Sequence, residues 1–226
     1  MKDEKKELLS VPIRHIDIKT FNAIPLIEAF DHMAFQSRNL AQACKIYHTM
    51  LADKDCSIVL CLAGSLVSAG LKNVLVDMIR HNMVDAIVST GAIVVDQDFF
   101  EGLGFQHYRG EVRVDDSKLQ KMHVDRIYDT FIDEDDLRIC DMTTKEIADE
   151  LPPRPYSSRE FIYEMGRYLD KHGKNPDSFV LEAYKHDLPI FCPAFSDSSA
   201  GFGLVFHQHD RKTNYLTIDS VKDFRE

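Results

Sequence analysis

Short, almost uninterrupted apolar runs alternate with amphipathic segments through the middle of the chain. The runs at 57–63 and 84–89 have the length and apolar character of strands buried on both faces. Between them, residues 66–80 carry apolar side chains at helical spacing, and a further helix is expected over about 96–103. This alternation of strand, turn and helix predicts an α/β fold, a Rossmann-like parallel sheet with helices on both faces.

Helical spacing also precedes this pattern. Apolar side chains of residues 26–51 share one helical face, which predicts one long helix or two helices joined near 37–39. Residues 1–10 are charged, as in a frayed chain end. A chain of 226 residues is long enough for one domain with a sizeable core. We therefore predict an arm over residues 1–22 and one domain over residues 23–226, whose sheet follows an N-terminal helical segment.

The second half of the chain continues the alternation of helices and strands. Ser157 and Glu160 form a capping box, which predicts the start of a helix that ends at Gly173. The segment 104–156 before it is less regular. The other predicted elements are a helix at 178–186, a buried strand at 188–193, strand candidates at 203–207 and 215–218, and the start of a helix at 219–226.

Composition and charge narrow the class of protein. The net charge of −10, the sequence pI of about 5.4 and the lack of a long basic run disfavour binding to nucleic acid or to an anionic membrane. No run approaches the roughly 20 apolar residues that cross a bilayer. The charged N-terminus has no apolar stretch typical of a secretory signal. We therefore expect a cytoplasmic protein.

The cysteines and histidines predict neither disulfides nor a metal site. No CxxC spacing occurs among the five cysteines, which are Cys44, Cys56, Cys61, Cys140 and Cys192. An odd number scattered through apolar segments predicts reduced thiols in a reducing compartment. His207 and His209 would share one face of the expected strand, but two imidazoles without a third ligand do not make a zinc site.

Three turns that follow predicted strands carry the candidate chemistry. They are Ala63–Ser65, Ser89–Ala92 and Ala194–Ser199, all small and rich in hydroxyl groups. Ligands of open α/β sheets bind outside the carboxyl ends of the strands, where small residues let the backbone approach a phosphate. The same residues also simply make tight turns, so both interpretations stay open. No G-x-G-x-x-G and no P-loop motif occurs, so any NAD site must be built differently.

Three carboxylates lie just beyond the strand ends. Asp96 and Asp197 could orient a ribose hydroxyl or hold an ammonium group. For Asp98 we favour a helix first-turn position, stabilised by the dipole of its own helix. The acidic cluster at 133–136 is expected to face water.

Longer segments resemble the deoxyhypusine synthase family. The run Cys56–Gly104, with its HNMVD stretch at 81–85 before a strand and a small-residue turn, is similar to the first half of these enzymes. The segment PIFCPAFSDSSAGFG at 189–203 resembles the family's turn after a central strand, and LTIDSVKDFR at 216–225 is a weaker match. The resemblance covers most of residues 24–226.

This resemblance implies an NAD-dependent enzyme that transfers the aminobutyl group of spermidine to an acceptor amine, assembled as a homo-oligomer, usually a tetramer. The acceptor would be a lysine of the hypusine-bearing translation factor. By motif, the implied NAD-contacting residues are Gly64, Ser65, Leu66, Val67, Ser68, Thr90, Gly91, Ala92, Asp96 and Asp197. The positions implied for spermidine are Val95, Asp96 and Phe202.

Departures from the family pattern keep two alternatives open. The first turn reads Ala63-Gly64-Ser65 where the eukaryotic enzymes have Thr-Ser-Asn, and Phe202 replaces a spermidine-binding aspartate. The later lysine-bearing segments of the family have no counterpart, so the chain resembles the N-terminal two-thirds and the nucleophilic lysine is expected beyond Glu226. A homospermidine synthase with putrescine as acceptor and a non-catalytic partner subunit therefore remain alternatives.

Overall fold

A three-stranded parallel sheet lies at the centre of the computed structural model, which describes residues 2–226. Its strands are β1 (Val59–Cys61), β2 (Ala86–Val88) and β7 (Ile190–Phe191), in the order β1-β2-β7. The ladder continues one residue beyond the strands, where Leu62 N donates to Val88 O and Ser89 N donates to Phe191 O, both at 2.8 Å. All three predicted buried runs are therefore confirmed as neighbouring parallel strands.

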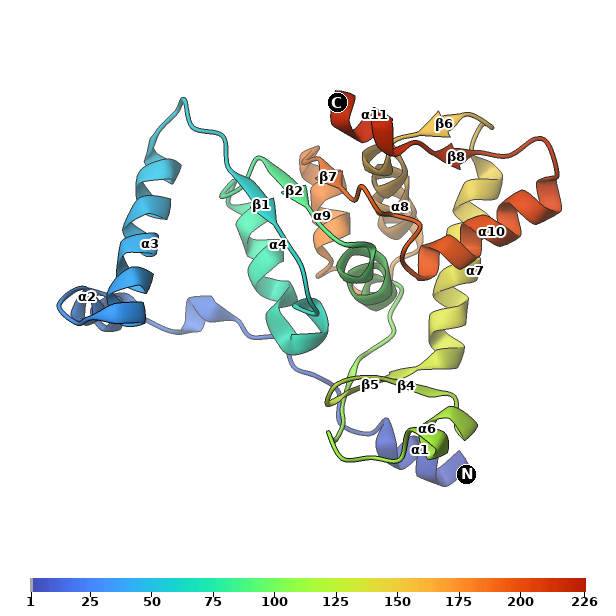
Figure 1. The fold of residues 1–226 in the computed structure, drawn as a ribbon, viewed down its shortest axis with the longest axis horizontal. Coiled ribbons are helices and arrows are strands. Elements are labelled where there is room, and N and C mark those ends of the chain that lie inside the picture. Colours follow the sequence, from blue (N-terminus) through green and yellow to red (C-terminus); the bar gives the residue numbers. More distant parts are fainter. Residues whose placement is uncertain (1) are drawn as a thin grey trace.

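Helices follow and cover these strands, which confirms the predicted α/β class (Figure 1). Ile87 of β2 and Ile93, Val94 and Phe99 of the helix after it are 0% exposed, so the centre of the core lies between them. The helix expected at 96–103 begins earlier, at residue 92. The helical segments that flank the sheet are η2 (Val67–Leu71), α4 (Lys72–Arg80), η3 (Ala92–Phe99), α5 (Phe100–Gly102), α8 (Ser158–His172), α9 (Phe179–His186) and α10 (Ser199–Arg211).

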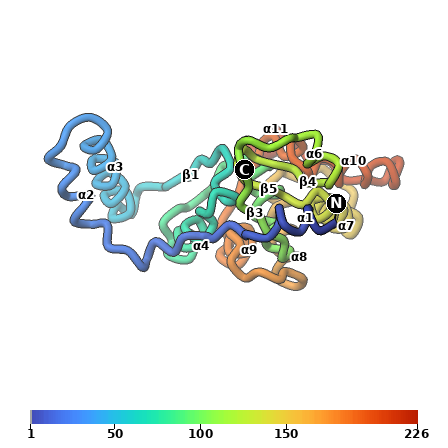
Figure 2. Tube along the Cα trace, turned by 90° about the horizontal axis from the view of Figure 1, so that it is seen from below, coloured from blue at the N-terminus to red at the C-terminus, as the bar shows by residue number. Residues whose placement is uncertain are grey.

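The N-terminal helical segment is a hairpin that stands away from the sheet at one end of the elongated molecule (Figures 1 and 2). It consists of α2 (Ile24–Asp31) and α3 (Phe35–Ala52), so the break lies at 32–34 rather than near 37–39. Tyr47 anchors α3, since its hydroxyl donates to Met83 O at 2.7 Å. Within α3, Ala41 is the one fully buried residue, so the hairpin contributes little to the central core.

The N-terminal arm runs along the molecule and joins a second, small sheet (Figure 2). Ile13 N donates to His107 O and Arg109 N donates to Val11 O, so the arm adds an edge to β3. The arm begins with a short helix, and its last residue, Leu8, and the following Leu9 pack on the core of this small sheet. The elements are α1 (Lys2–Leu8), η1 (Ile18–Thr20), β3 (Tyr108–Arg109), α6 (Asp116–Lys121), β4 (Val124–Ile127) and β5 (Thr130–Asp133), with the antiparallel order β3-β5-β4.

A buried cluster of charged groups ties the arm to the sheet-covering helices. Glu101 Oε2 accepts from Lys72 Nζ at 2.6 Å and lies 2.7 Å from His15 Nε2, while its Oε1 lies 2.7 Å from His107 Nδ1. Lys72 is 2% exposed and Glu101 is 4% exposed. Burial opposes ionisation of Glu101, but the hydrogen bonds from His107 and His15 and the charge of Lys72 hold its pKa well below its ordinary value.

The segment 104–156 contains a long helix that the sequence pattern did not predict, α7 (Glu134–Glu150). Its N-cap is Asp133, whose side chain accepts from Asp135 N at 2.9 Å. Asp133 also pairs with Lys5 Nζ at 2.7 Å. The acidic cluster at 133–136 is therefore the capped first turn of a helix, and Asp133 does not simply face water.

The strand candidate at 203–207 is wrong, because these residues lie in α10, which packs along α7. Glycine permits this contact: a Cβ on Gly203 would lie 2.3 Å from Asp141 O. The candidate at 215–218 is confirmed as β8 (Thr217–Ile218), parallel to β6 (Pro155–Tyr156), and α11 (Ser220–Arg225) follows it. No described helix has the length and apolar character needed to span a membrane.

Candidate functional site

The three predicted turns meet at one edge of the central sheet. Because β1, β2 and β7 are parallel neighbours in that order, their carboxyl ends lie at the same edge. The turn Ser89–Ala92 follows the middle strand and therefore lies between the other two. In open α/β sheets ligands bind at this edge, so the three turns together form the candidate site.

The second and third turns are in direct contact at Gly91. A Cβ on Gly91 would lie 2.5 Å from Ser198 Cβ and 3.3 Å from Phe195 O, so no larger residue fits without displacing the third turn. Ser198 holds that turn in shape, since its Oγ donates to Phe195 O at 2.8 Å. The glycine therefore sets how closely the two turns approach.

In the first turn, Gly64 faces open space, whereas hydrogen bonds hold the residues that follow it. Gly64 has φ +85°, which favours glycine, and a Cβ there would meet nothing within 4 Å. Further along, Ser68 N donates to Gln97 Oε1 at 3.1 Å and Ser68 Oγ donates to Ser65 O at 3.1 Å. The buried amide of Gln97 thus links the first turn to η3, a role that no motif in the sequence indicated.

The residues implied for NAD binding differ in what they present at this edge. The side of the edge open to solvent carries Gly64, Thr90 and Asp197, which are exposed, and Ser65, Leu66 and Ala92, which are half-buried. Val67, Ser68 and Gly91 are buried. Val95, one of the implied spermidine positions, is 0% exposed and lies in the core.

Asp96 joins the second turn to the third. Its Oδ1 accepts from Ser199 N at 3.0 Å, at the start of α10. A second carboxylate, Asp141 of α7, also lies near Ser199, and the sequence pattern did not single it out. Burial raises the pKa of Asp96, and burial together with the charge of Asp96 raises the pKa of Asp141 to about 6. Two carboxylates with raised pKa values therefore lie near one serine.

Asp98 does not act on its own helix. It is 0% exposed, and its carboxylate accepts from Ser178 Oγ at 2.6 Å, Phe179 N at 3.0 Å and Val180 N at 2.9 Å. It therefore stabilises the N-terminus of α9, which corrects the first-turn interpretation. Burial raises its pKa to about 6 despite these three donors.

The two histidines lie on α10 rather than on a strand. His207 is 2% exposed, with Nδ1 2.7 Å from Asp149 Oδ1, and its Nε2 accepts from Leu216 N at 3.0 Å. His209 is exposed, so the two side chains do not share a face. Among residues 2–226, no group of three or more His, Cys, Asp or Glu side chains is placed to hold a metal ion. Cys140 and Cys192 are buried, whereas Cys44 and Cys61 are exposed.

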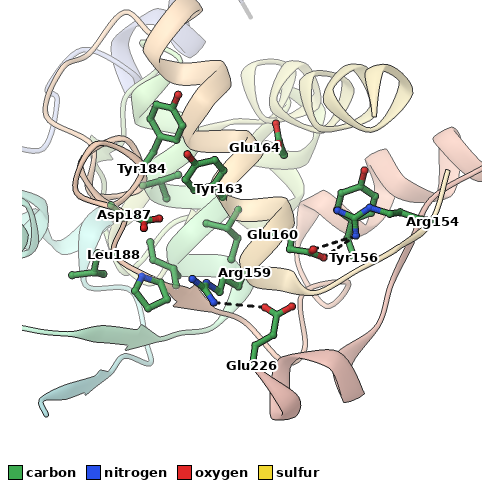
Figure 3. A pocket seen from close by; sticks show the side chains of 15 residues that line it. Arg154, Tyr156, Arg159, Glu160, Tyr163, Glu164, Tyr184, Asp187, Leu188 and Glu226 are labelled. Atoms are coloured by element: carbon green, nitrogen blue, oxygen red, sulfur yellow. Dashed lines mark hydrogen bonds and ion pairs between the residues drawn. The ribbon is translucent and has the colours of Figure 1, made fainter. Parts of the chain in front are cut away.

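A separate cavity of about 300 Å³ lies at the amino end of β7, near Pro189 and Ile190 (Figure 3). Figure 3 shows Arg159 directed at Glu226, a pair 4.0 Å apart. None of the implied NAD or spermidine positions lines this cavity. The candidate site therefore remains the opposite edge of the sheet, with its three turns.

The fold is that of an α/β protein with a parallel sheet and covering helices, and comparison with known proteins gives the family. The deoxyhypusine synthase family model matches residues 25–226. "Deoxyhypusine synthase-like protein" of Chlorobaculum parvum is 57% identical over 99% of this chain and 64% of its own length. The protein of the same description from Coxiella burnetii is 56% identical over 98% of this chain and 63% of its own length. The chain belongs to the deoxyhypusine synthase family.

A more distant relative agrees with this assignment, and a solved structure shows the same fold. "Probable deoxyhypusine synthase 2" of Methanosarcina acetivorans is 39% identical over 95% of this chain and 61% of its own length. A crystal structure of a proposed deoxyhypusine synthase from Entamoeba histolytica has the same fold, with a TM-score of 0.64 over 94% of this chain and 72% of that one, at 20% identity. The chain thus spans less than two thirds of the curated relatives described above.

Proposed function

We propose that this chain forms the NAD-binding part of an aminobutyl transferase, which moves the aminobutyl group of spermidine to an acceptor amine in the cytoplasm. The observation that carries the proposal is the meeting of three glycine- and hydroxyl-bearing turns at the carboxyl edge of parallel strands in a chain of this family. NAD would take a hydride from a spermidine carbon and later return it.

The residues at the edge fit a dinucleotide. The open space above Gly64 allows close approach of a phosphate, and the exposed Thr90 hydroxyl can donate to it. Asp197 is exposed at the third turn, where a carboxylate can accept from ribose hydroxyls. Leu66 and Ala92 are half-buried beside them and would pack on the ligand.

The NAD part of the proposal is tested by calorimetric titration of the chain with NAD. We expect binding, and we expect Asp197→Ala to weaken it about tenfold or more, because hydrogen bonds to a charged group are worth roughly 1.5–3 kcal/mol. Asp55→Asn, an exposed carboxylate before β1 at the opposite edge, is the matched control and should bind NAD like the wild type. Absence of NAD binding to the folded wild-type chain would refute the proposal.

Analysis of the reaction products identifies the amine that accepts the aminobutyl group. The three turns contain no lysine, and Lys72, which is buried, is engaged by Glu101, so the nucleophilic lysine is proposed to come from outside these turns. Spermidine labelled in its butyl portion would be incubated with NAD and the complete enzyme, with putrescine or with the acceptor protein. Label in homospermidine identifies the diamine acceptor, label in protein identifies a lysine acceptor, and 1,3-diaminopropane leaves in both cases. Failure to release it would argue for the partner-subunit alternative.

We also propose that the protein is a homo-oligomer, with the α2–α3 hairpin as part of the contact. On this hairpin, Phe35 is 88% exposed, Ile46 61% and Leu40 48%. Exposed apolar side chains of this kind mark surfaces that contact another protein. Ile46→Ser combined with Leu40→Ser should shift the mass in light scattering towards 25.9 kDa, the mass of one chain. Val221→Ser on α11, at a position 74% exposed, is the control. An unchanged mass for the hairpin variant would contradict this contact.

A further inference from the structure

The helix η3 holds three parts of the molecule through three consecutive side chains, and it lies at the centre of the fold (Figure 1). Asp96 accepts from Ser199 N in the third turn at 3.0 Å. Gln97 Oε1 accepts from Ser68 N, just after the first turn, at 3.1 Å. Asp98 accepts from the N-terminus of α9. Because η3 begins where the second turn ends, residues 96 and 97 connect the helix after this turn to the other two turns.

Residues 64–68, which are proposed to contact NAD, lie between two bends of the chain. Gly64 has φ +85° and Gly70 has φ +96°, so the backbone is in the left-handed region on either side of this segment. Val67 is 0% exposed and anchors the segment by packing in the core. The hydrogen bond from Ser68 N to Gln97 joins the segment to the neighbouring helix.

This hydrogen bond is buried and replaces one that the helix cannot make. Ser68 is the second residue of η2, and the first N–H groups of a helix lack a carbonyl partner within it. Ser68 and Gln97 are each 1% exposed. A bond between backbone groups follows one residue later, from Ala69 N to Ser65 O at 3.0 Å. The position of residues 64–68 therefore depends on a side chain of η3 as well as on their own backbone.

A second bridge joins the same two helical segments further from the turns. The ion pair of Lys72 with Glu101, at 2.6 Å, lies four residues further along both segments. Because the bend at Gly70 lies between the two bridges, this ion pair keeps the helices together but does not by itself fix residues 64–68. A variant of Gln97 should therefore fold and lose only the bridge beside the turns.

We propose that Gln97 is a positioning residue, whose buried amide holds residues 64–68 in the conformation that receives NAD. Without an acceptor at this place, Ser68 N–H is buried and unpaired, which favours conformations in which the segment moves towards water. A binding site that is formed for only part of the time binds its ligand more weakly in proportion. This inference rests on the proposed function, because NAD is the ligand, and Gln97 itself is not proposed to touch it.

The test is calorimetric titration of the full chain with NAD. Gln97→Met keeps a side chain of similar size without the acceptor, and we expect it to weaken NAD binding about tenfold. Gln97→Leu also lacks the acceptor and serves as a second variant with the same expectation. Asp98→Asn is the matched control, since it changes the next residue of the same helix, which is also buried but bonds to α9. It should lower the melting temperature and leave NAD affinity unchanged.

Hydrogen exchange of the Ser68 amide, followed by NMR without NAD, distinguishes positioning from a general loss of stability. In the wild type this N–H is paired and buried, so its exchange should be slow. In Gln97→Met it should exchange at least about tenfold faster, while amides in the middle of α4 keep their wild-type rates. In Gln97→Glu, whose carboxylate can still accept from Ser68 N, the exchange should stay slow.

The outcomes separate this inference from the proposed function. Equal NAD affinity of the wild type and folded Gln97→Met, or unchanged Ser68 exchange in this variant, overturns the inference and leaves the proposed function standing. An equal loss of NAD affinity in Asp98→Asn also overturns it, because any loosening of η3 would then have the same effect. A wild-type chain that binds no NAD refutes the proposed function and the inference with it.

Discussion

Glu101→Ala should lower the free energy of unfolding by about 3–5 kcal/mol, because it leaves the ammonium of Lys72 buried without a counter-ion. Lys72 is 2% exposed, and its Nζ lies 2.6 Å from Glu101 Oε2. His107 is also buried and loses its carboxylate partner. Urea unfolding of wild type and variant at pH 7 gives the difference. A loss below 1 kcal/mol would show that the cluster is not a major source of stability.

The controls separate the buried cluster from a general effect of charge. Glu111→Ala removes an exposed carboxylate from the same region and should change stability by less than about 0.5 kcal/mol. The Glu101 effect should be local as well, since His15 ties the arm to this cluster. Cleavage by trypsin after the exposed Arg14 should therefore be faster in Glu101→Ala than in Glu111→Ala.

The sign of the pH dependence follows from the low pKa of Glu101. The folded protein holds this pKa below the ordinary value of 4.5, so its stabilisation is fully present above that pH and is lost as the pH falls further. The difference in stability between wild type and Glu101→Ala should therefore be constant near neutrality and shrink in acid. A difference that grows in acid would contradict the assigned charge state.

Gly91→Ala should destabilise the protein by about 1–3 kcal/mol and abolish or strongly weaken the proposed NAD binding. The added Cβ would lie 2.5 Å from Ser198 Cβ and 2.6 Å from Ser198 Oγ, so the second and third turns must separate. Thermal melting and calorimetric titration with NAD measure the two effects. Both turns carry residues proposed to contact NAD, so their separation disrupts the site even where the fold survives.

A second substitution tests whether the contact with Ser198 causes the loss. Ser198→Gly removes the atoms that the new Cβ would meet, leaving Phe195 O at 3.3 Å as the nearest neighbour. The double variant Gly91→Ala with Ser198→Gly should therefore recover part of the stability lost in Gly91→Ala. Ser198→Gly by itself loses the hydrogen bond from Ser198 Oγ to Phe195 O, so its own stability is the reference. A Gly91→Ala effect as large in the Ser198→Gly background as in the wild type would mean that the glycine acts through something other than this close approach.

Local patterns were sufficient to predict the elements that are most regular. The apolar runs that became β1, β2 and β7 were identified because each is short, nearly continuous and followed by turn residues. The expectation of burial on both faces is wrong for β1, because it lies at the edge of the sheet, with Val59 53% exposed and Cys61 exposed. The capping box of Ser157 and Glu160 is formed in the structure, with Glu160 N donating to Ser157 Oγ at 3.1 Å and Ser157 N donating to Glu160 Oε2 at 2.9 Å. A cap involves neighbouring residues only and so can be read from the sequence.

The helix α7 was missed although a local signal existed. Asp133 is an N-cap, and Glu134, Asp135 and Asp136 form the acidic first turn that a helix N-terminus favours. The same residues also form an acidic run, which is typical of a solvated surface. The N-cap preference of Asp133, followed by helical spacing of apolar residues, was the signal that predicts a helix here. The negative charge of the run carried no information about the fold.

The sequence by itself determined the class of fold, the three turns after the strands and the family resemblance, because strand runs, turn residues and motifs depend on neighbours along the chain. Only the tertiary structure decided which distant groups meet. Asp141 and Ser199 come together because Gly203 lets α10 approach α7, and Gln97 reaches Ser68 from the next helix. Burial also changes the ionisation of these carboxylates. It raises the pKa of Asp141 and Asp98 to about 6, since low-polarity surroundings disfavour the ionised carboxylate.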